Sequence, residues 1–227
     1  MISSGQVFMS PSILNANFDD LENEIAKVSS VSDFLHLDIM DNKFVPNFTF
    51  SMARASEIIS FSKLPVDAHL MIEDPDNLGP KYAQFGCHSV TFHLEAVKDA
   101  KKTIENIKSN GSKVGIAIKP KTEFSAVADL VEHIDLLLIM TVEPGFGGQA
   151  FMQDQMSKVK IAREHIDKCA VPQPLLQVDG GISEYTIETA AQSGANCFVA
   201  GSAVFKSNDP AQMLIRLRQL ALDKIKS

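Results

Sequence analysis

The chain has 227 residues, of which 45% are hydrophobic and 22% charged, and its formal net charge is −7 at neutral pH. This composition is ordinary for a globular protein. Its acidic balance disfavours nucleic acid and anionic membrane surfaces as partners, because both require clustered Lys and Arg. No apolar run approaches the roughly 18 residues that a membrane-spanning helix needs.

The cysteines indicate a reducing environment. Cys87, Cys169 and Cys197 are far apart and odd in number, and no C-x-x-C pair occurs. This usage favours a reduced, cytoplasmic protein over a secreted one. The first residues lack a basic stretch followed by an apolar one, so we expect neither a signal nor a transit peptide.

Short apolar runs alternate with segments of helical pattern along the chain. The runs predict strands at 7–14, 34–40, 66–71, 89–94, 113–118, 134–141, 174–179 and 197–200. The helical patterns cover 19–30, 50–61, 75–85, 96–109, 123–131, 154–168, 183–193 and 210–226. Several strands are almost continuously apolar, which is typical of parallel sheets that are buried on both faces.

Residues that favour helix ends and starts stand at several borders. Asn110-Gly111 and Ser193-Gly194 end two helices, and Asp209-Pro210 begins the last one. Eight strands that are each followed by a helix predict a single α/β domain over 1–227, a (β/α)8 TIM barrel. An open doubly wound sheet is the alternative, but no G-x-G-x-x-G follows the first strand.

Four ionisable residues fall where a barrel places its chemistry, at the carboxyl ends of strands. His36 and Asp38 are two residues apart and share a strand face, His69 lies near the end of the third strand, and Asp179 closes the seventh. Two imidazoles and two carboxylates suit zinc, manganese, iron(II) or cobalt. A lone inward His is more often a hydrogen-bonded core residue, so the four together carry the hypothesis. Asp67, two residues before His69, is either a residue that orients His69 or a member of a lower barrel layer.

Glycines gather in the loops after the last three strands. These loops contain Gly145, Phe146, Gly147 and Gly148, then Gly180 and Gly181, then Gly201 and Ser202. Barrels often bind phosphate after strands seven and eight, where backbone N–H groups approach the anion. The alternative is that the glycines only permit tight turns. The loop 142–150 is also a candidate lid.

Methionines and one serine are weaker candidates for the substrate pocket. Met40, Met71 and Met140 each stand at or near a strand end, where a polarizable thioether suits an irregular ligand surface, although Met is also a common core residue. Ser10, near the end of the first strand, offers a hydroxyl to a substrate.

Segments from every strand–helix unit together resemble the ribulose-phosphate 3-epimerase family. They are MSPSIL (9–14), HLDIMDNKFVPNFTF (36–50), DAHLMIEDP (67–75), FHLEA (92–96), GIAIKPKT (115–122), MTVEPGFGGQ (140–149), VDGGI (178–182) and GSAVF (201–205). The resemblance implies interconversion of D-ribulose 5-phosphate and D-xylulose 5-phosphate in the pentose phosphate pathway, by inversion at C3 through an enediolate.

The resemblance also implies roles for the candidate residues. His36, Asp38, His69 and Asp179 match the ligands of one divalent metal ion per subunit. Asp38 matches the group that accepts the proton from ribulose 5-phosphate, and Asp179 the group that donates one. Ser10, His69 and the three methionines match the substrate pocket, and the glycine loops meet the phosphate. We further expect a homo-oligomer, either a dimer or a hexamer.

Three positions depart from the family pattern, and three rival functions remain. Asn42 and Ser51 stand where Gly is usual, and Lys121 replaces the Gly of K-P-G-T. Asn tolerates positive φ, so Asn42 is expected to keep the same turn. The rivals are a 3-epimerase for another ketose phosphate such as allulose 6-phosphate, a decarboxylase or aldolase, and a non-catalytic sugar-phosphate sensor. The absence of Lys from strands two and three disfavours the second, and the intact metal set disfavours the third.

Overall fold

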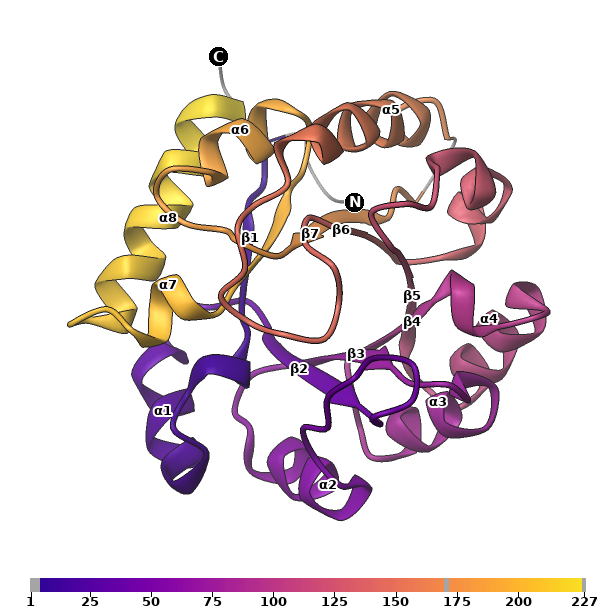
Figure 1. Ribbon diagram of the computed structural model, residues 1–227, viewed down its shortest axis with the longest axis horizontal. Helices are drawn as coiled ribbons and strands as arrows, with labels where there is room; N and C mark the ends of the chain where they lie inside the picture. The colour runs from indigo at the N-terminus through magenta and orange to yellow at the C-terminus, as the bar shows by residue number, and fades with distance from the viewer. Residues whose placement is uncertain (1–4, 170–171, 226–227) are drawn as a thin grey trace.

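Parallel strands form a ring at the centre of the computed structural model, which describes residues 5–169 and 172–225 (Figure 1). The strands are β1 Phe8–Pro11, β2 Leu35–Met40, β3 Val66–Met71, β4 Ser89–His93, β5 Lys113–Ile118, β6 Leu136–Met140, β7 Leu175–Asp179 and β8 Cys197–Ala200. They pair in the order β1-β8-β7-β6-β5-β4-β3-β2. An isolated parallel bridge from Ser12 to His36 brings the two edge strands together. The (β/α)8 barrel is therefore confirmed, and the open doubly wound sheet is excluded.

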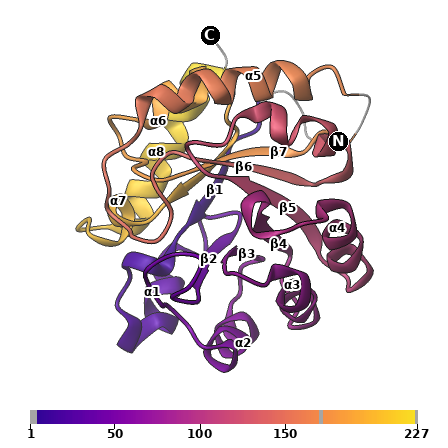
Figure 2. The same cartoon turned by 45° about the vertical axis from the view of Figure 1, so that its right-hand side comes forward.

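Helices surround this ring on all sides (Figures 1 and 2). The α-helices are α1 Leu21–Val28, α2 Met52–Phe61, α3 Pro75–Gln84, α4 Ala100–Ser109, α5 Met156–Ile166, α6 Ile187–Gln192, α7 Ser202–Phe205 and α8 Pro210–Ile225. Short 3-10 helices are η1 Ile13–Asn15, η2 Phe18–Asp20, η3 Leu94–Ala96, η4 Phe124–Ala126, η5 Ala128–His133 and η6 Gln153–Gln155. Among the described residues, no helix has both the length and the apolar character that crossing a membrane requires.

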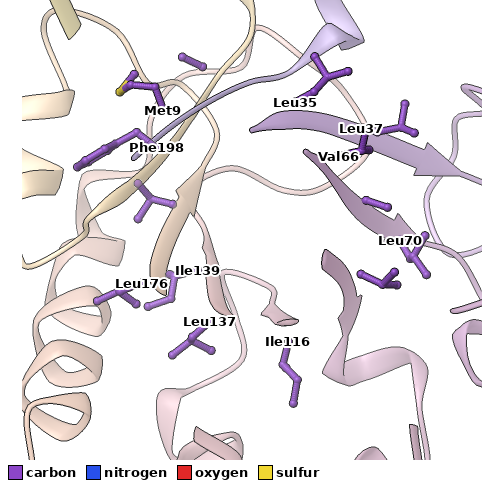
Figure 3. Packing of buried hydrophobic residues seen from close by; sticks show 14 of the residues in the cluster. Met9, Leu35, Leu37, Val66, Leu70, Ile116, Leu137, Ile139, Leu176 and Phe198 are labelled. Atoms are coloured by element: carbon purple, nitrogen blue, oxygen red, sulfur yellow. The ribbon is translucent and has the colours of Figure 1, made fainter. Parts of the chain in front are cut away.

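Alternation along each strand builds the core between strands and helices. In β2, Leu35, Leu37 and Ile39 are buried in the main hydrophobic cluster, whereas His36 and Asp38 face the barrel interior. Figure 3 shows members of this cluster from strands all around the ring. Each fully buried Leu or Ile contributes about 1.5–3 kcal/mol to folding, so the outward faces hold the barrel in shape.

Most of the buried polar side chains inside the barrel come from one part of the ring of strands. The strands β1 to β4 turn buried polar side chains inward; they are Ser10, His36, Asp38, Asp67, His69, Ser89, Thr91 and His93. The strands β5 to β8 contribute a second hydrophobic cluster that includes Leu136, Leu138 and Met140. The strand β7 adds the buried Gln177 and ends at Asp179, so polar groups reach the interior from both sides of the ring.

Most predicted elements are present, but their borders differ. Strands 66–71, 113–118 and 197–200 match to the residue, whereas 7–14 is shorter because η1 begins at Ile13. The fourth helix begins at Ala100 rather than 96, where Asp99 accepts a hydrogen bond from the N–H of Lys102. Residue 226, the predicted end of the last helix, lies outside the described residues.

The predicted helix at 123–131 is wrong. The segment forms the two 3-10 helices η4 and η5, separated at Val127, whose φ of −114° departs from the helical value near −63°. Ser125, Val127 and Asp129 are weaker helix formers than Ala or Leu. Phe124, Val127 and Val131 are nevertheless buried, so packing rather than helix propensity fixes this segment.

The predicted turn and cap residues act as expected. Gly111 and Gly194 have φ of 96° and 104°, which only Gly adopts readily after a helix. The Asp209 carboxylate accepts a hydrogen bond from the N–H of Gln212 and caps α8.

Candidate active site

Four ionisable side chains meet inside the barrel. One potential ligand atom from each of His36, Asp38, His69 and Asp179 lies within 4.8 Å of the other three. Asp38 Oδ1 is 3.1 Å from His69 Nδ1 and 3.4 Å from His36 Nε2. Asp179 Oδ2 is 3.6 Å from His69 Nδ1 and 3.8 Å from His36 Nε2. The residues that the sequence singles out are therefore brought together.

Strand register explains this convergence. Asp38 and His69 are direct partners on the adjacent strands β2 and β3, and both turn inward. Asp179 ends β7, which is distant from β2 and β3 in the strand order. His36 is only the second residue of β2, so its expected place at a carboxyl end is wrong. It reaches the cluster from a deeper level with its Nε2 atom.

Burial and mutual contacts set the charges of the cluster. Burial alone would raise the pKa of Asp38, but His36 and His69 outweigh it and hold that pKa well below its usual range. Burial would lower the pKa of His36, but Asp38 and Asp67 raise it well above normal. Burial, followed by the Asp38 charge, raises the pKa of Asp179. Two carboxylates with pKa values pushed apart are the arrangement that acid and base partners need.

The cluster fits a divalent transition metal. It offers two imidazole nitrogens and two carboxylate oxygens, a donor set suited to zinc, iron(II), manganese or cobalt. His36 Nε2 and His69 Nδ1 approach within 3.4 Å of each other, and both point into the cluster. The lone pairs of two nitrogen atoms this close together can both coordinate one cation.

Asp67 contacts His36 rather than His69. Its Oδ2 lies 3.0 Å from His36 Nδ1 and accepts a hydrogen bond from Gln177 Nε2 at 2.9 Å, and its Oδ1 accepts one from Ser89 Oγ at 2.8 Å. The expectation that Asp67 orients His69 is wrong. The lower-layer reading is right, because Asp67 and His36 are partners in register one layer below Asp38.

His69 instead contacts a second histidine, which sequence reasoning missed. His69 Nε2 lies 2.9 Å from His93 Nε2, and His93 Nδ1 lies 3.3 Å from Glu95 Oε2. Burial lowers the pKa of His93 to about 4. Burial would raise the pKa of Glu95, but hydrogen bonds from His93, Thr122 and the backbone of Lys119 lower it to about 2. The available signal was the alternation in β4, which turns His93 inward.

A cavity lies directly over Asp38 and Asp179. Its other lining residues are Ser12, Leu14, Asn15, Met40, Met71, Met140, Val142, Pro144, Gly145, Phe146, Gly147, Gly148, Gln149, Gly180, Gly181, Ile182, Val199, Gly201 and Ser202. The three predicted methionines and every predicted glycine-loop residue are thus in its wall. None of these described lining residues is Lys or Arg.

Ser10 is not brought to this cavity. It lies in β1, fully buried, and its hydroxyl has no hydrogen-bond partner among the described residues. Ser12, which sequence reasoning passed over, lines the cavity, and its hydroxyl donates to Asp38 Oδ2 at 2.6 Å. The structure therefore favours Ser12 over Ser10 as the serine that contacts a substrate.

The glycines divide into two groups. Gly145, Gly148, Gly180 and Gly181 have positive φ, so their turns require Gly for backbone reasons. Gly201 has an ordinary φ of −101°, and a Cβ there would stand 3.0 Å from Asn15 Oδ1. At Gly201 the missing side chain, rather than the turn, is the feature that leaves room in the cavity.

The loop between β6 and α5 crosses the open end of the ring (Figure 1). Gln149 Nε2 donates to the carbonyls of Glu143 and Phe146, which closes the loop on itself. Asn47 Nδ2 donates to the carbonyl of Gly145 at 2.9 Å, which ties the loop to the one after β2. The loop remains a candidate lid.

The three departures from the family pattern are accommodated. Asn42 has a φ of 58°, as expected for the turn that it occupies. The Ser51 hydroxyl accepts a hydrogen bond from the N–H of Arg54 and caps α2. Around Lys121, the N–H of Thr122 donates to the carbonyl of Lys119, and the turn needs no positive φ.

Comparisons with known proteins agree with this geometry. The ribulose-phosphate 3 epimerase family model matches residues 8–205. The ribulose-phosphate 3-epimerase of Mycobacterium leprae is 45% identical over 94% of this chain and 94% of its own. That of Mycobacterium bovis is 43% identical over 96% of this chain and 95% of its own. The structure of 3-hexulose-6-phosphate synthase from Salmonella typhimurium, with a TM-score of 0.68 and 20% identity, covers 96% of this chain and 100% of that chain and supports the fold alone. The chain belongs to the ribulose-phosphate 3-epimerase family and is an isomerase of sugar phosphates.

Proposed function

We propose that the protein interconverts D-ribulose 5-phosphate and D-xylulose 5-phosphate by inverting C3, within the pentose phosphate pathway. The observation that carries this proposal is the meeting of Asp38 and Asp179 with two histidines under one cavity. Inversion requires a proton to leave one face of a carbon beside a ketone and another to arrive on the opposite face. Two carboxylates from β2 and β7 can divide this task, whereas one base cannot easily do both.

In the ribulose-to-xylulose direction, Asp38 accepts the C3 proton and the C–H electron pair forms the enediolate. Asp179 then delivers a proton to the opposite face of C3, and the ketone at C2 is restored. This order of proton transfers is the one that the family resemblance implies for Asp38 and Asp179. Ser12 orients Asp38 by donating to its second oxygen.

We propose that His36, Asp38, His69 and Asp179 hold one divalent metal ion per subunit, either zinc, iron(II), manganese or cobalt. When bound, such an ion supplies positive charge that stabilises the negative oxygen of the enediolate. Met40, Met71 and Met140 form an apolar wall beside the reacting carbons, which excludes water and strengthens electrostatic interactions in the site.

The phosphate is proposed to bind at the glycine loops through backbone N–H groups. The absence of Lys and Arg from the described lining residues supports this, because no side-chain cation is available there. Gly201 leaves room for the anion just before Ser202 begins α7.

The function is tested by metal analysis of the purified protein, with epimerase activity measured before and after chelation and after metal is restored. Side-by-side kinetics on ribulose 5-phosphate and allulose 6-phosphate test the pentulose assignment. A higher kcat/KM for allulose 6-phosphate would contradict it, and no turnover of either substrate would favour a sensor.

The three free cysteines support a cytoplasmic location. The homo-oligomer and the extent of the domain over 1–227 remain predictions.

A further inference from the structure

A line of side chains runs from the four-residue cluster to the surface. His69 Nε2 contacts His93 Nε2 at 2.9 Å, and His93 Nδ1 contacts Glu95 Oε2 at 3.3 Å. The side chains of His69 and His93 are fully buried, whereas Glu95 is 23% exposed. Nothing in the proposed proton transfers uses His93 or Glu95, although both belong to the FHLEA segment.

The hydrogen bonds of this line determine where its protons lie. Glu95 Oε1 accepts a hydrogen bond from the backbone N–H of Lys119 at 2.8 Å and another from the hydroxyl of Thr122. An ionised carboxylate can only accept, so His93 Nδ1 carries the proton that faces Glu95 Oε2. A neutral His93 ring with its proton on Nδ1 has its lone pair on Nε2, the atom that faces His69 Nε2 at 2.9 Å. His69 Nε2 must then donate to it.

In the neutral ring of His69, a proton on Nε2 leaves Nδ1 with a lone pair. Nδ1 is the atom that points at Asp38 and Asp179. Without the line, the Asp38 carboxylate at 3.1 Å would favour a proton on that same nitrogen. Glu95 and Asp38 therefore favour opposite tautomers of one imidazole, and a metal ligand must have the tautomer that Glu95 favours.

We propose that Glu95, acting through His93, is a positioning residue that keeps His69 in the Nε2–H tautomer and so presents the Nδ1 lone pair to a divalent metal. This proposal rests on the proposed function, because it names a residue that prepares the metal site of that enzyme. Outer carboxylates that orient metal-binding histidines act in this way in other metal sites.

The two histidines of the cluster are held by different carboxylates. His36 is oriented directly by Asp67, which is completely buried. His69 is oriented by Glu95, which is tied to the loop after β5, where Lys121 departs from the family pattern. Phe44 packs against the His93 ring with centroids 4.9 Å apart, which fixes the plane in which His93 can relay a hydrogen bond. Changes in the loop after β5 can thus reach the metal site without touching it.

The first test measures Co²⁺ affinity by competition with a chromophoric chelator at fixed pH. Glu95→Gln should weaken Co²⁺ binding by about 10- to 100-fold, the usual effect of losing an outer partner of a metal ligand. The control is Glu123→Gln. It removes a charge from the loop after β5, whose Lys119 and Thr122 bond to Glu95, and it should leave Co²⁺ affinity unchanged. Equal affinity in wild type and Glu95→Gln would overturn the proposal.

The second test asks whether Glu95 acts through His93. His93→Phe keeps a ring beside Phe44 but cannot form the hydrogen bonds to Glu95 and His69, so it should weaken Co²⁺ binding to a similar extent. In the His93→Phe background, Glu95→Gln should then have no further effect, because coupled residues are not additive. Additive losses of Co²⁺ affinity would show that Glu95 affects the metal directly through its charge, or only supports the structure of the loop. Either result would overturn the proposal that Glu95 acts through His93.

A third measurement stays informative if His93→Phe fails to fold. Two-bond ¹H–¹⁵N correlation spectra of the chelated full chain, ¹⁵N-labelled at its six histidines, report each tautomer directly. His69 should carry its proton on Nε2 in wild type and shift toward Nδ1 in Glu95→Gln. An Nδ1–H or doubly protonated His69 in wild type would contradict the proposal. If wild type binds Co²⁺ but lacks epimerase activity, the proposed function fails while this test remains valid.

Discussion

The two-base mechanism makes a sharp prediction for Asp38→Asn and Asp179→Asn. Asn keeps the shape of Asp and one oxygen, so the amide in Asp38→Asn can still accept the hydrogen bond that Ser12 donates at 2.6 Å. Packing should therefore change little, and the loss should be one of basicity. General acid–base groups contribute about 10²- to 10⁴-fold, so each variant should lose at least about 10² in kcat, or about 2.7 kcal/mol of transition-state stabilisation.

Solvent exchange separates the two roles. In D₂O, Asp38→Asn still has Asp179 on the face that removes the C3 proton of xylulose 5-phosphate. It should exchange that proton with solvent while leaving ribulose 5-phosphate unlabelled. Asp179→Asn should show the converse, because Asp38 faces the C3 proton of ribulose 5-phosphate. NMR of each substrate at C3 follows both reactions.

Metal content must be measured in the same samples, because both carboxylates also belong to the cluster. Near-normal turnover of either variant with its metal retained would refute the two-base reasoning. Loss of exchange from both substrates in both variants, again with metal retained, would show that the two groups do not act independently on opposite faces.

Three further predictions concern the metal, the phosphate and acid stability. His69→Ala should lower metal content as well as rate; full occupancy, measured by elemental analysis, would make His69 structural. Gly201→Ala should raise KM for ribulose 5-phosphate by about 10-fold or more but scarcely affect free ribulose, because its Cβ enters the proposed phosphate site; an equal change for both would move the phosphate elsewhere. Burial lowers the pKa of His93 to about 4, so between about pH 6.5 and pH 4 the unfolded chain binds a proton that the folded chain does not bind. The free energy of unfolding should therefore be highest above about pH 6.5 and fall by up to about 3 kcal/mol toward pH 4. Urea titrations should show that this free energy depends less on pH in His93→Phe.

The fold was predictable because its signal is local and repeated. Each strand carries apolar residues on the face toward the helices, as Leu35, Leu37 and Ile39 do in β2, and the pattern recurs around the ring. The helix predicted at 123–131 failed for the opposite reason. Its apolar spacing is helical, but Val127 departs from helical geometry, and the buried contacts of Phe124 and Val131 are satisfied by two short turns.

The sequence predicts which residues form the candidate site better than it predicts how deep in the barrel each of them lies. Alternation along a strand states which side chains face inward, but not how far each lies from the mouth of the barrel. That height depends on the stagger between strands, which no single strand encodes. Ser10 and Ser12 share one face of the same segment, yet Ser12 lines the cavity and Ser10 is sealed below it.

The same geometry explains the errors around the histidines. Asp67 stands two residues before His69 in sequence, but the register of β2 with β3 sets it beside His36. His93 is far in sequence from all four predicted ligands, and the ring of strands brings it to the far side of His69. A search of the sequence for metal ligands finds residues whose atoms would face a bound ion. The residues that determine the tautomer of those ligands face away from it, and only the register between strands reveals them.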